Sequence, residues 1–175
     1  VQRSAESRAL SDYYQRLQQD LLARGLLRTD GGGPDTPYGA RDLLANFERI
    51  AFYDEYARGS GLTRASFAPG RLKRWPGPVR MTMEFGATVD RAQRTRDENE
   101  LRSFAARLAR VTGHPISVSD PAAANFHVLV MGEDDRGAAI ARIRQLVPNI
   151  DPAALDIFRR LPRSIHCLVL AFSAE

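Results

Sequence analysis

The sequence predicts an α+β fold in which helices cover a mixed sheet. Residues 79–85 alternate apolar and polar side chains, which is the period of a half-buried strand. Residues 96–111 instead repeat apolar side chains at helical spacing. From residue 78 onward the patterns give strand, helix, strand, strand, two helices and a last strand, an order expected when helices pack on one sheet.

Four segments are predicted to form the sheet. The first shows the alternation just described, the second is short, and the last two are nearly continuous apolar runs. They are Val79–Phe85, Ile116–Ser119, Phe126–Met131 and Ile165–Phe172.

Two helices are predicted before the sheet. The first spans Ser4–Leu27, with leucine and tyrosine side chains on one stripe. A stretch at 28–37 with three glycines and two prolines predicts a linker or loop. The second helix is expected to start with Thr36 as cap and Pro37 in the first turn. It is expected to end near Arg49, with an extended segment after it.

Three further helices are predicted within the second half of the chain. Residues 96–111 form the first of them, and Gly113 is expected to end it. Residues 134–147 form the next, and Asp151 can cap a short helix that begins at Pro152. The predicted domain division is an N-terminal helix with its linker at 1–33 and an α+β domain at 34–175.

The composition is that of an ordinary soluble domain. The chain has 175 residues, 43% hydrophobic and 26% charged, and no apolar run approaches the roughly 18 residues of a membrane span. Its net charge is +4, and the basic residues are interleaved with 21 acids, so a nucleic-acid-binding module is the weakest hypothesis. The densest basic cluster, residues 70–75, is a candidate anion contact; a solvated turn with Trp75 packed in the core is favoured.

No catalytic or metal-binding pattern is visible. The three histidines, His114, His127 and His166, lack ligand spacing, which predicts no bound metal and no cofactor in this chain. His127 and His166 lie in predicted strands and are expected to be packed or edge-facing. The acids at 97–98 and 133–135 begin helices, where they favour the positive end of the dipole. Asp54 and Glu55 lie beside tyrosines but have no metal partner, so no catalytic residue is assigned.

Three stretches resemble a known family. They are "NFERIAFYDEY" at 46–56, "LKRWPGPVRMTMEFG" at 72–86, and "NFHVLVMGEDD" followed at distance by "HCLVLAFSAE". They are similar to uncharacterised, predicted lipoproteins of Gram-negative proteobacteria, known only as a domain of unknown function. The resemblance covers most of the chain after about residue 38, and none of its motifs is chemically diagnostic.

The resemblance implies a fold and a site. Family members continue past the equivalent of Phe172 with a strand and a helix similar to a worn zinc-peptidase helix. The order of elements here is also that of the N-terminal part of a zincin-like fold. By that analogy the last segment is the edge strand of an incomplete domain, and a peptide would lie along it. Its candidate contact residues are His166, Leu168, Leu170 and Phe172.

Cys167 has two open interpretations. The family places a second cysteine near the start of the missing helix, so Cys167 would form a disulfide to that segment in an oxidising compartment. The rival interpretation is a small buried side chain.

The function expected from the resemblance is that of a zincin-like, catalytically degenerate protein of the cell envelope that binds peptide or envelope material. The alternative is a structural or accessory subunit of an envelope complex, docking through its N-terminal helix. Whether the protein is an enzyme stays open. For this chain the absence of enzymatic activity is favoured. If the full-length protein is an enzyme, the expected class is a metallopeptidase-like hydrolase. A zinc ion in the full-length protein is the less favoured alternative.

The expected location is periplasmic or outer-membrane associated. The expected partners are an envelope protein or peptide and no nucleic acid, with membrane contact only through a lipid anchor outside this chain.

Overall fold

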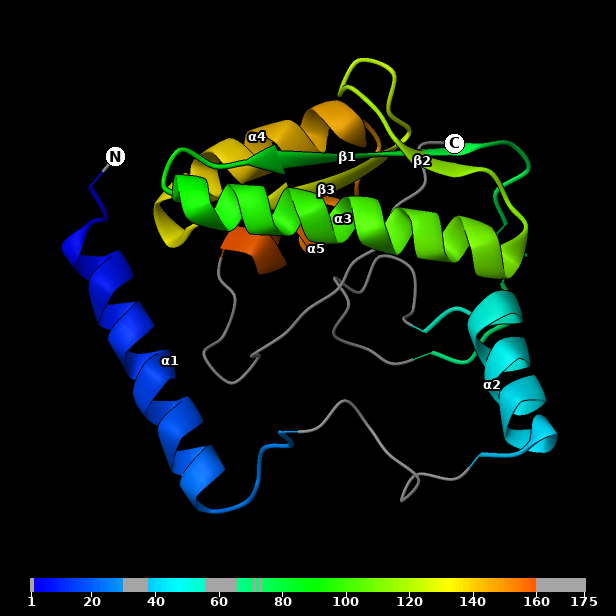
Figure 1. The fold of residues 1–175 in the computed structure, drawn as a ribbon, viewed down its shortest axis with the longest axis horizontal. Helices are drawn as coiled ribbons and strands as arrows, with labels where there is room; N and C mark the ends of the chain where they lie inside the picture. The colour runs from blue at the N-terminus through cyan, green and yellow to red at the C-terminus, as the bar shows by residue number, and fades with distance from the viewer. Residues whose placement is uncertain (1, 30–37, 56–65, 71, 73, 160–175) are drawn as a thin grey trace. The chain divides into compact units, whose positions relative to one another are not determined.

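The computed structural model describes residues 2–29, 38–55, 66–70, 72 and 74–159 (Figure 1). These residues contain five α-helices, one short 3₁₀ helix and three strands, so the α+β class is confirmed. The chain divides into two compact units. The sheet unit is residues 74–159, and the helical unit comprises the described residues between 3 and 72. The predicted division after residue 33 stays a prediction.

The sheet unit is built on three parallel strands. They are β1 (Val79–Phe85), β2 (Ile116–Val118) and β3 (Phe126–Val130), and β1 lies between the other two. In the register, β1 residue Met81 is opposite both the last residue of β2 and the first residue of β3. The first three predicted strands are therefore confirmed, and the fourth, Ile165–Phe172, lies outside the described residues.

The two outer strands cover different parts of β1. β2 pairs with the first three residues of β1, whereas β3 pairs with the last five (Figure 1). The side chain of Asn125 extends the β3 ladder backwards: it accepts a 2.7 Å hydrogen bond from the Arg80 amide and donates one of 2.9 Å to the Pro78 carbonyl. The side-chain amide of Asn125 therefore takes the place of one further pair of backbone hydrogen bonds in the ladder.

Helix α3 (Arg91–Thr112) covers one face of the sheet. It begins five residues before the predicted start because the side chain of Asp90 caps it, accepting from the Gln93 amide. It ends at Gly113, as predicted, in a left-handed conformation with φ of 68°. The core between α3 and the sheet is formed by buried apolar side chains, namely Val79, Met81, Leu101 and Ala105.

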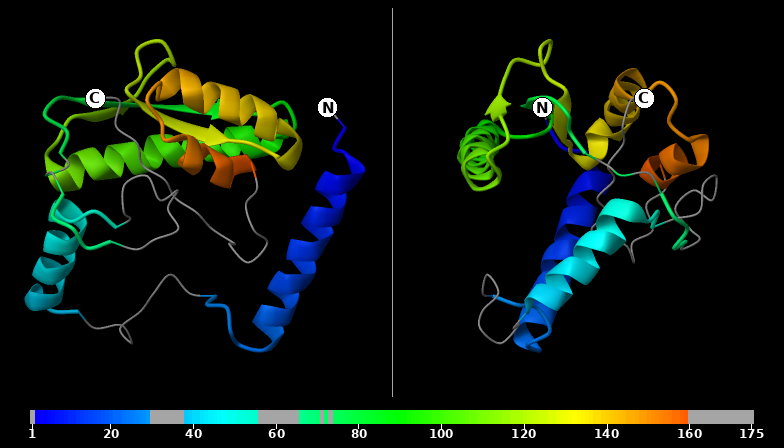
Figure 2. Two further views of the ribbon diagram at one scale, coloured as in Figure 1. Left: turned by 180° about the vertical axis from the view of Figure 1, so that it is seen from behind. Right: turned by 90° about the vertical axis from the view of Figure 1, so that its right-hand side faces the viewer.

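Helix α4 (Arg136–Leu146) lies on the opposite face of the sheet from α3 (Figure 2). The short 3₁₀ helix η1 (Glu133–Asp135) precedes it, and α5 (Pro152–Arg159) follows it. The Asp151 carboxylate accepts from the Ala153 amide at the start of α5, as the sequence predicts. The apolar side of α4 packs on α5 rather than on the sheet, around Ile150, Ala154 and Leu155.

The helical unit contains α1 (Ala5–Ala23) and α2 (Ala40–Phe52). Ser4, the first residue of the predicted helix, caps α1 by accepting from the Ser7 amide, and the helix ends four residues before the predicted end at Leu27. Two predictions for α2 are wrong. It begins after Gly39 instead of at Pro37, because the extended Gly39 backbone and the Asp42 carboxylate form its start. It also continues past Arg49 to Phe52.

The extended segment after α2 begins at Tyr53, which forms a bridge to Pro69.

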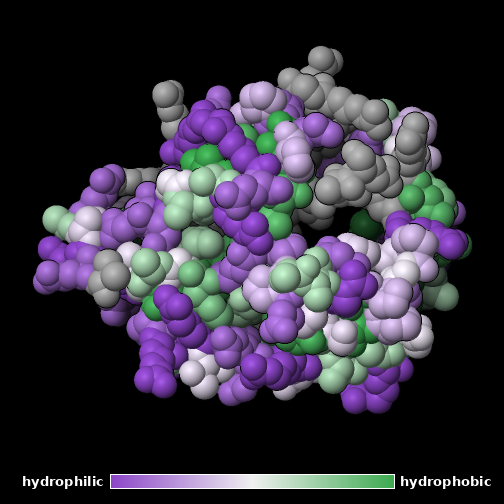
Figure 3. Space-filling model, turned by 90° about the horizontal axis from the view of Figure 1, so that it is seen from above, coloured by the Kyte–Doolittle hydropathy of each residue, from purple (hydrophilic) through white to green (hydrophobic). Residues whose placement is uncertain are grey.

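On the face shown in Figure 3, hydrophobic and hydrophilic residues lie in small mixed groups. Among the described residues, no helix combines the length and apolar character needed to cross a membrane.

Candidate functional site

Within the part of the chain that the structure describes, one edge of β1 has no partner strand beyond the end of β2. The Val79 amide donates to the Pro115 carbonyl, and the Met81 carbonyl accepts from the Ser119 amide at 2.8 Å. The amides and carbonyls of odd-numbered β1 residues therefore face the β2 side. Met83 and Phe85 continue this row past the end of β2, and no described residue pairs with their backbone on that side. Two donors and two acceptors thus form a short strand edge that no described strand pairs.

A groove of about 430 Å³ lies at this opening. Its floor includes Met83 and Leu101, where the strand meets α3. Its walls come from α3, from the last residue of β2 and from the segment that follows β2; they are Glu98, Arg102, Val118, Ser119, Asp120 and Pro121. The groove therefore combines an unpaired backbone edge with both apolar and charged side chains.

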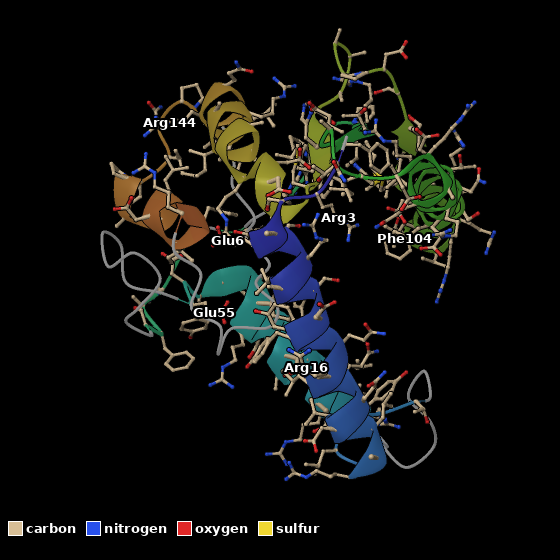
Figure 4. All side chains as sticks on the ribbon, turned by 90° about the vertical axis from the view of Figure 1, so that its left-hand side faces the viewer. Arg3, Glu6, Arg16, Glu55, Phe104 and Arg144 are labelled. Atoms are coloured by element: carbon tan, nitrogen blue, oxygen red, sulfur yellow. The ribbon has the colours of Figure 1, made fainter. Side chains whose placement is uncertain are left out.

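A second, larger groove of about 640 Å³ follows the other side of α3. It shares Met83 and Leu101 with the first groove, so these two side chains separate the grooves. The aromatic ring in it belongs to Phe104, which projects from α3 and is 51% exposed (Figure 4). Its charged lining residues are Asp97, Glu100 and Arg107.

A polar cluster joins β1, β3 and α4 on the opposite face of the sheet. The Glu84 carboxylate accepts from the Arg142 guanidinium through both oxygens, at 2.7 and 2.9 Å. One of these oxygens also lies 2.8 Å from Nδ1 of His127. The hydrogen bonds from Arg142 lower the pKa of Glu84 although burial opposes them, and the carboxylate in turn raises the pKa of Arg142.

This cluster is suited to holding elements together. A carboxylate beside a histidine can orient a general base, but such a base acts on a nucleophile or substrate within hydrogen-bond reach. No described serine, threonine or cysteine side chain has a hydrogen bond to His127. The paired charges instead fix α4 to the sheet, and His127 is a packed histidine, as the sequence predicts.

A second buried carboxylate links the loops after β1 and β3. Asp135 is 6% exposed and accepts hydrogen bonds from the hydroxyl and amide of Thr88 and from the amide of Gly132. Burial alone would raise the pKa of Asp135, but these hydrogen bonds together lower it. The bond from the Gly132 amide caps the start of η1, in agreement with the predicted place of this acid at a helix start, and the bonds from Thr88 add a link to the loop after β1. The loops also require Gly86, since a Cβ there would overlap the Asp135 carboxylate.

Asp97 and Glu98 lie beyond the first turn of α3, and that turn holds no acidic residue, so the prediction that they begin this helix is wrong; Glu98 instead lines the groove at the open edge.

The other residues singled out by the sequence lie apart from this groove. His114 Nε2 contacts the Gly77 carbonyl at 2.8 Å. Trp75 is 47% exposed and packs against Phe126, so the prediction that it lies in the core is wrong. Asp54 and Glu55 belong to the helical unit, where their backbones bond to Ala68 and Ser66.

The residues expected to bind peptide or form a disulfide lie outside the described residues. They are His166, Cys167, Leu168, Leu170 and Phe172. In the part of the chain that the structure describes, no three His, Cys, Asp or Glu residues are grouped so that they could hold a metal ion.

Comparison with known families decides the relationship of the chain. A family model described as a protein of unknown function, DUF2927, matches residues 40–175. The chain belongs to this family. The match begins at the first residue of α2 and includes all of the sheet unit. It agrees with the part of the resemblance that pointed to a domain of unknown function. Comparisons with curated proteins and with solved structures gave no match.

Sequence reasoning missed the open edge and the two carboxylate clusters. The edge depends on β2 being only three residues long, and strand ends are poorly marked in sequence. Glu84 and Arg142 are separated by 58 positions, so no local pattern relates them. One signal for Asp135 was present: two glycines, Gly86 and Gly132, each follow a strand at the same end of the parallel sheet.

Proposed function

We propose that this domain binds an extended peptide segment by strand addition at the open edge of β1. The observation that carries the proposal is that no described strand pairs with the backbone of Met83 and Phe85 on the side of the 430 Å³ groove. A peptide placed there would continue the line of β2 and satisfy donors and acceptors in alternation. The site differs from the one expected at 165–172, but the kind of recognition is the same.

The length of the edge sets the size of the bound segment. Four strand residues of β1, from Thr82 to Phe85, extend beyond the pairing with β2. At about 3.3 Å per residue, they span roughly 13 Å, which accommodates three to five peptide residues. Such a short pairing predicts weak, reversible binding, because few backbone hydrogen bonds offset the ordering of the peptide.

The direct test removes one edge donor without disturbing the β1–β3 ladder. Proline at position 83 lacks the amide that faces the open side, whereas the ladder to β3 uses even-numbered amides such as that of Gly86. Met83→Ala is the matched control, since it loses the same side chain and keeps the amide. The probes are end-blocked heptapeptides that alternate threonine and valine around one variable central residue.

We expect NMR titration of the wild-type protein with the peptides to shift the resonances of residues that line the groove. The Met83→Ala variant should also bind the peptides, whereas the Met83→Pro variant should not. Backbone N-methylation of the probe should also abolish binding, because it removes the peptide donors. Equal binding by the proline and alanine variants, or no binding to the wild type by any probe, would overturn the proposal. Retained dispersion in the spectrum of Met83→Pro shows that the variant is folded; Phe85→Pro against Phe85→Ala repeats the test if it is not.

We also propose a periplasmic or outer-membrane-associated location for the intact protein. The support is the sequence resemblance to predicted lipoproteins. The test is fractionation of cells that express the complete gene, alongside cytosolic and periplasmic marker proteins. Recovery of the protein with the cytosolic marker would show this location to be wrong.

A further inference from the structure

The groove beside β1 has a charge character that differs from that of the whole chain. The chain carries a net charge of +4. The groove is lined by two carboxylates, Glu98 and Asp120, and by one guanidinium, Arg102. Arg102 is already engaged by two neighbours on α3: it donates to the Asn99 side chain at 3.0 Å and lies 3.7 Å from Glu98. With two carboxylates against one guanidinium, the lining has a net negative charge, so the groove favours a cation over an anion.

The register of an added strand determines which peptide residue meets these charges. Residues opposite each other on neighbouring strands project to the same face of the sheet. Met83 packs against the core between β1 and α3, so its side chain faces α3. The peptide residue opposite Met83 must project the same way, toward Leu101 and Glu98. The residues before and after it project to the other face.

We infer that the bound peptide places a lysine or arginine side chain opposite Met83, with its charged end at Glu98. The inference rests on the proposed strand addition and names the class of peptide that the edge takes. The long aliphatic part of such a side chain covers Leu101 and Val118 at the groove floor and wall. The cationic end reaches the rim, where Glu98 has a side-chain exposure of 47% and can be approached from solvent.

The second groove supplies a matched control for this charge. Glu100 lies on the same helix and lines the groove on the other side of α3, not the groove at the open edge. Glu98→Gln and Glu100→Gln change the net charge of the protein equally. A long-range electrostatic effect would weaken cation binding to the same extent in both variants, whereas a direct contact distinguishes them.

The experiment uses three heptapeptides that differ only in their central residue, which is lysine, norleucine or glutamate. We expect the wild-type protein to bind the lysine peptide most tightly and the glutamate peptide least tightly. Glu98→Gln should weaken the lysine peptide about two- to five-fold, the range of an exposed ion pair, without changing the norleucine peptide. Glu100→Gln should leave the Kd of both peptides unchanged. Raising the salt concentration should remove the lysine preference.

Three results overturn the inference. One is equal affinity for the lysine and norleucine peptides, which leaves strand addition intact and removes the basic preference. Another is equal weakening by Glu98→Gln and Glu100→Gln, which shows a general field instead of a contact. The third is the absence of binding by every peptide, in which case the proposed function has failed and the inference falls with it.

Discussion

The α3 face and the α4 face of the sheet are held by different interactions. On the α3 face, Met81 and Leu101 are buried in an apolar core. On the α4 face, a glutamate on β1 accepts from an arginine on α4 and lies beside a histidine on β3. The first face is stabilised by burial, which is non-directional, and the second by hydrogen bonds between charges, which require particular partners. The two faces should therefore respond differently to the same kinds of substitution.

The largest effect is expected on the apolar face. Met81→Ala removes a side chain that is 6% exposed and leaves a cavity between β1 and α3. We expect a loss of about 2–4 kcal/mol in the free energy of unfolding, measured by urea denaturation. Val111→Ala is the control, because Val111 is 65% exposed on α3 and its truncation should change stability by less than about 0.5 kcal/mol. Similar losses from both variants would contradict an apolar core at this face.

The next largest effect is expected in the loops that follow β1 and β3. Gly86→Ala places a Cβ on the Asp135 carboxylate, which is itself held by Thr88 and Gly132. We expect a loss of about 1–3 kcal/mol, as for other overpacked sites. Gly77→Ala is the matched control, since a Cβ there meets no atom within 4 Å. Thermal unfolding of the two variants checks this prediction, and an unchanged Tm for Gly86→Ala would show that the loops are not tightly packed.

The comparison of faces also shows what the sequence could predict. The alternation at 79–85 correctly placed Val79 and Met81 in the core, because period-2 burial is recorded locally in the residue types. The same alternation suggested that the polar face was solvated, but Thr82 is 3% exposed and Glu84 is covered by α4. That covering depends on a helix more than 50 residues later in the chain. Pairings of this kind have no local signature.

The sequence did not predict the open edge of β1. A strand-edge peptide site was expected from family resemblance at 165–172, whereas the open edge described here belongs to β1. Its existence depends on the exact residue at which β2 stops pairing. Ser119 still bonds to Met81, and the chain then crosses to the other side of β1, guided by the Asn125 side chain. Neither event changes the hydrophobic pattern, so neither could be anticipated from it.

A smaller effect is expected from breaking the charge cluster on the α4 face. Glu84→Gln keeps the shape of the side chain but removes the charge that Arg142 and His127 contact. We expect a loss of about 1–2 kcal/mol in urea denaturation, since a partly buried guanidinium loses its partner. The double variant Glu84→Met with Arg142→Met should be at least as stable as Glu84→Met alone, because no uncompensated charge remains. Additive losses in the double variant would show that the two side chains do not interact energetically.

The smallest effect, and the sharpest contrast between the faces, is the pH dependence of these losses. The pKa of Glu84 is lowered in the folded protein, chiefly by the hydrogen bonds from Arg142. A carboxyl whose folded pKa lies below its unfolded pKa binds more protons when the chain is unfolded. Its contribution to stability is therefore complete above the ordinary glutamate pKa, about 4.3, and is lost as the pH falls through the folded pKa. The stability difference between wild type and Glu84→Gln should shrink as the pH is lowered from about 6 to about 3. The difference between wild type and Met81→Ala should stay constant over the same range, because no titrating group is removed. Urea denaturation at each pH measures both differences. A Glu84→Gln difference that does not change with pH would mean that the charge on Glu84 does not stabilise the α4 face.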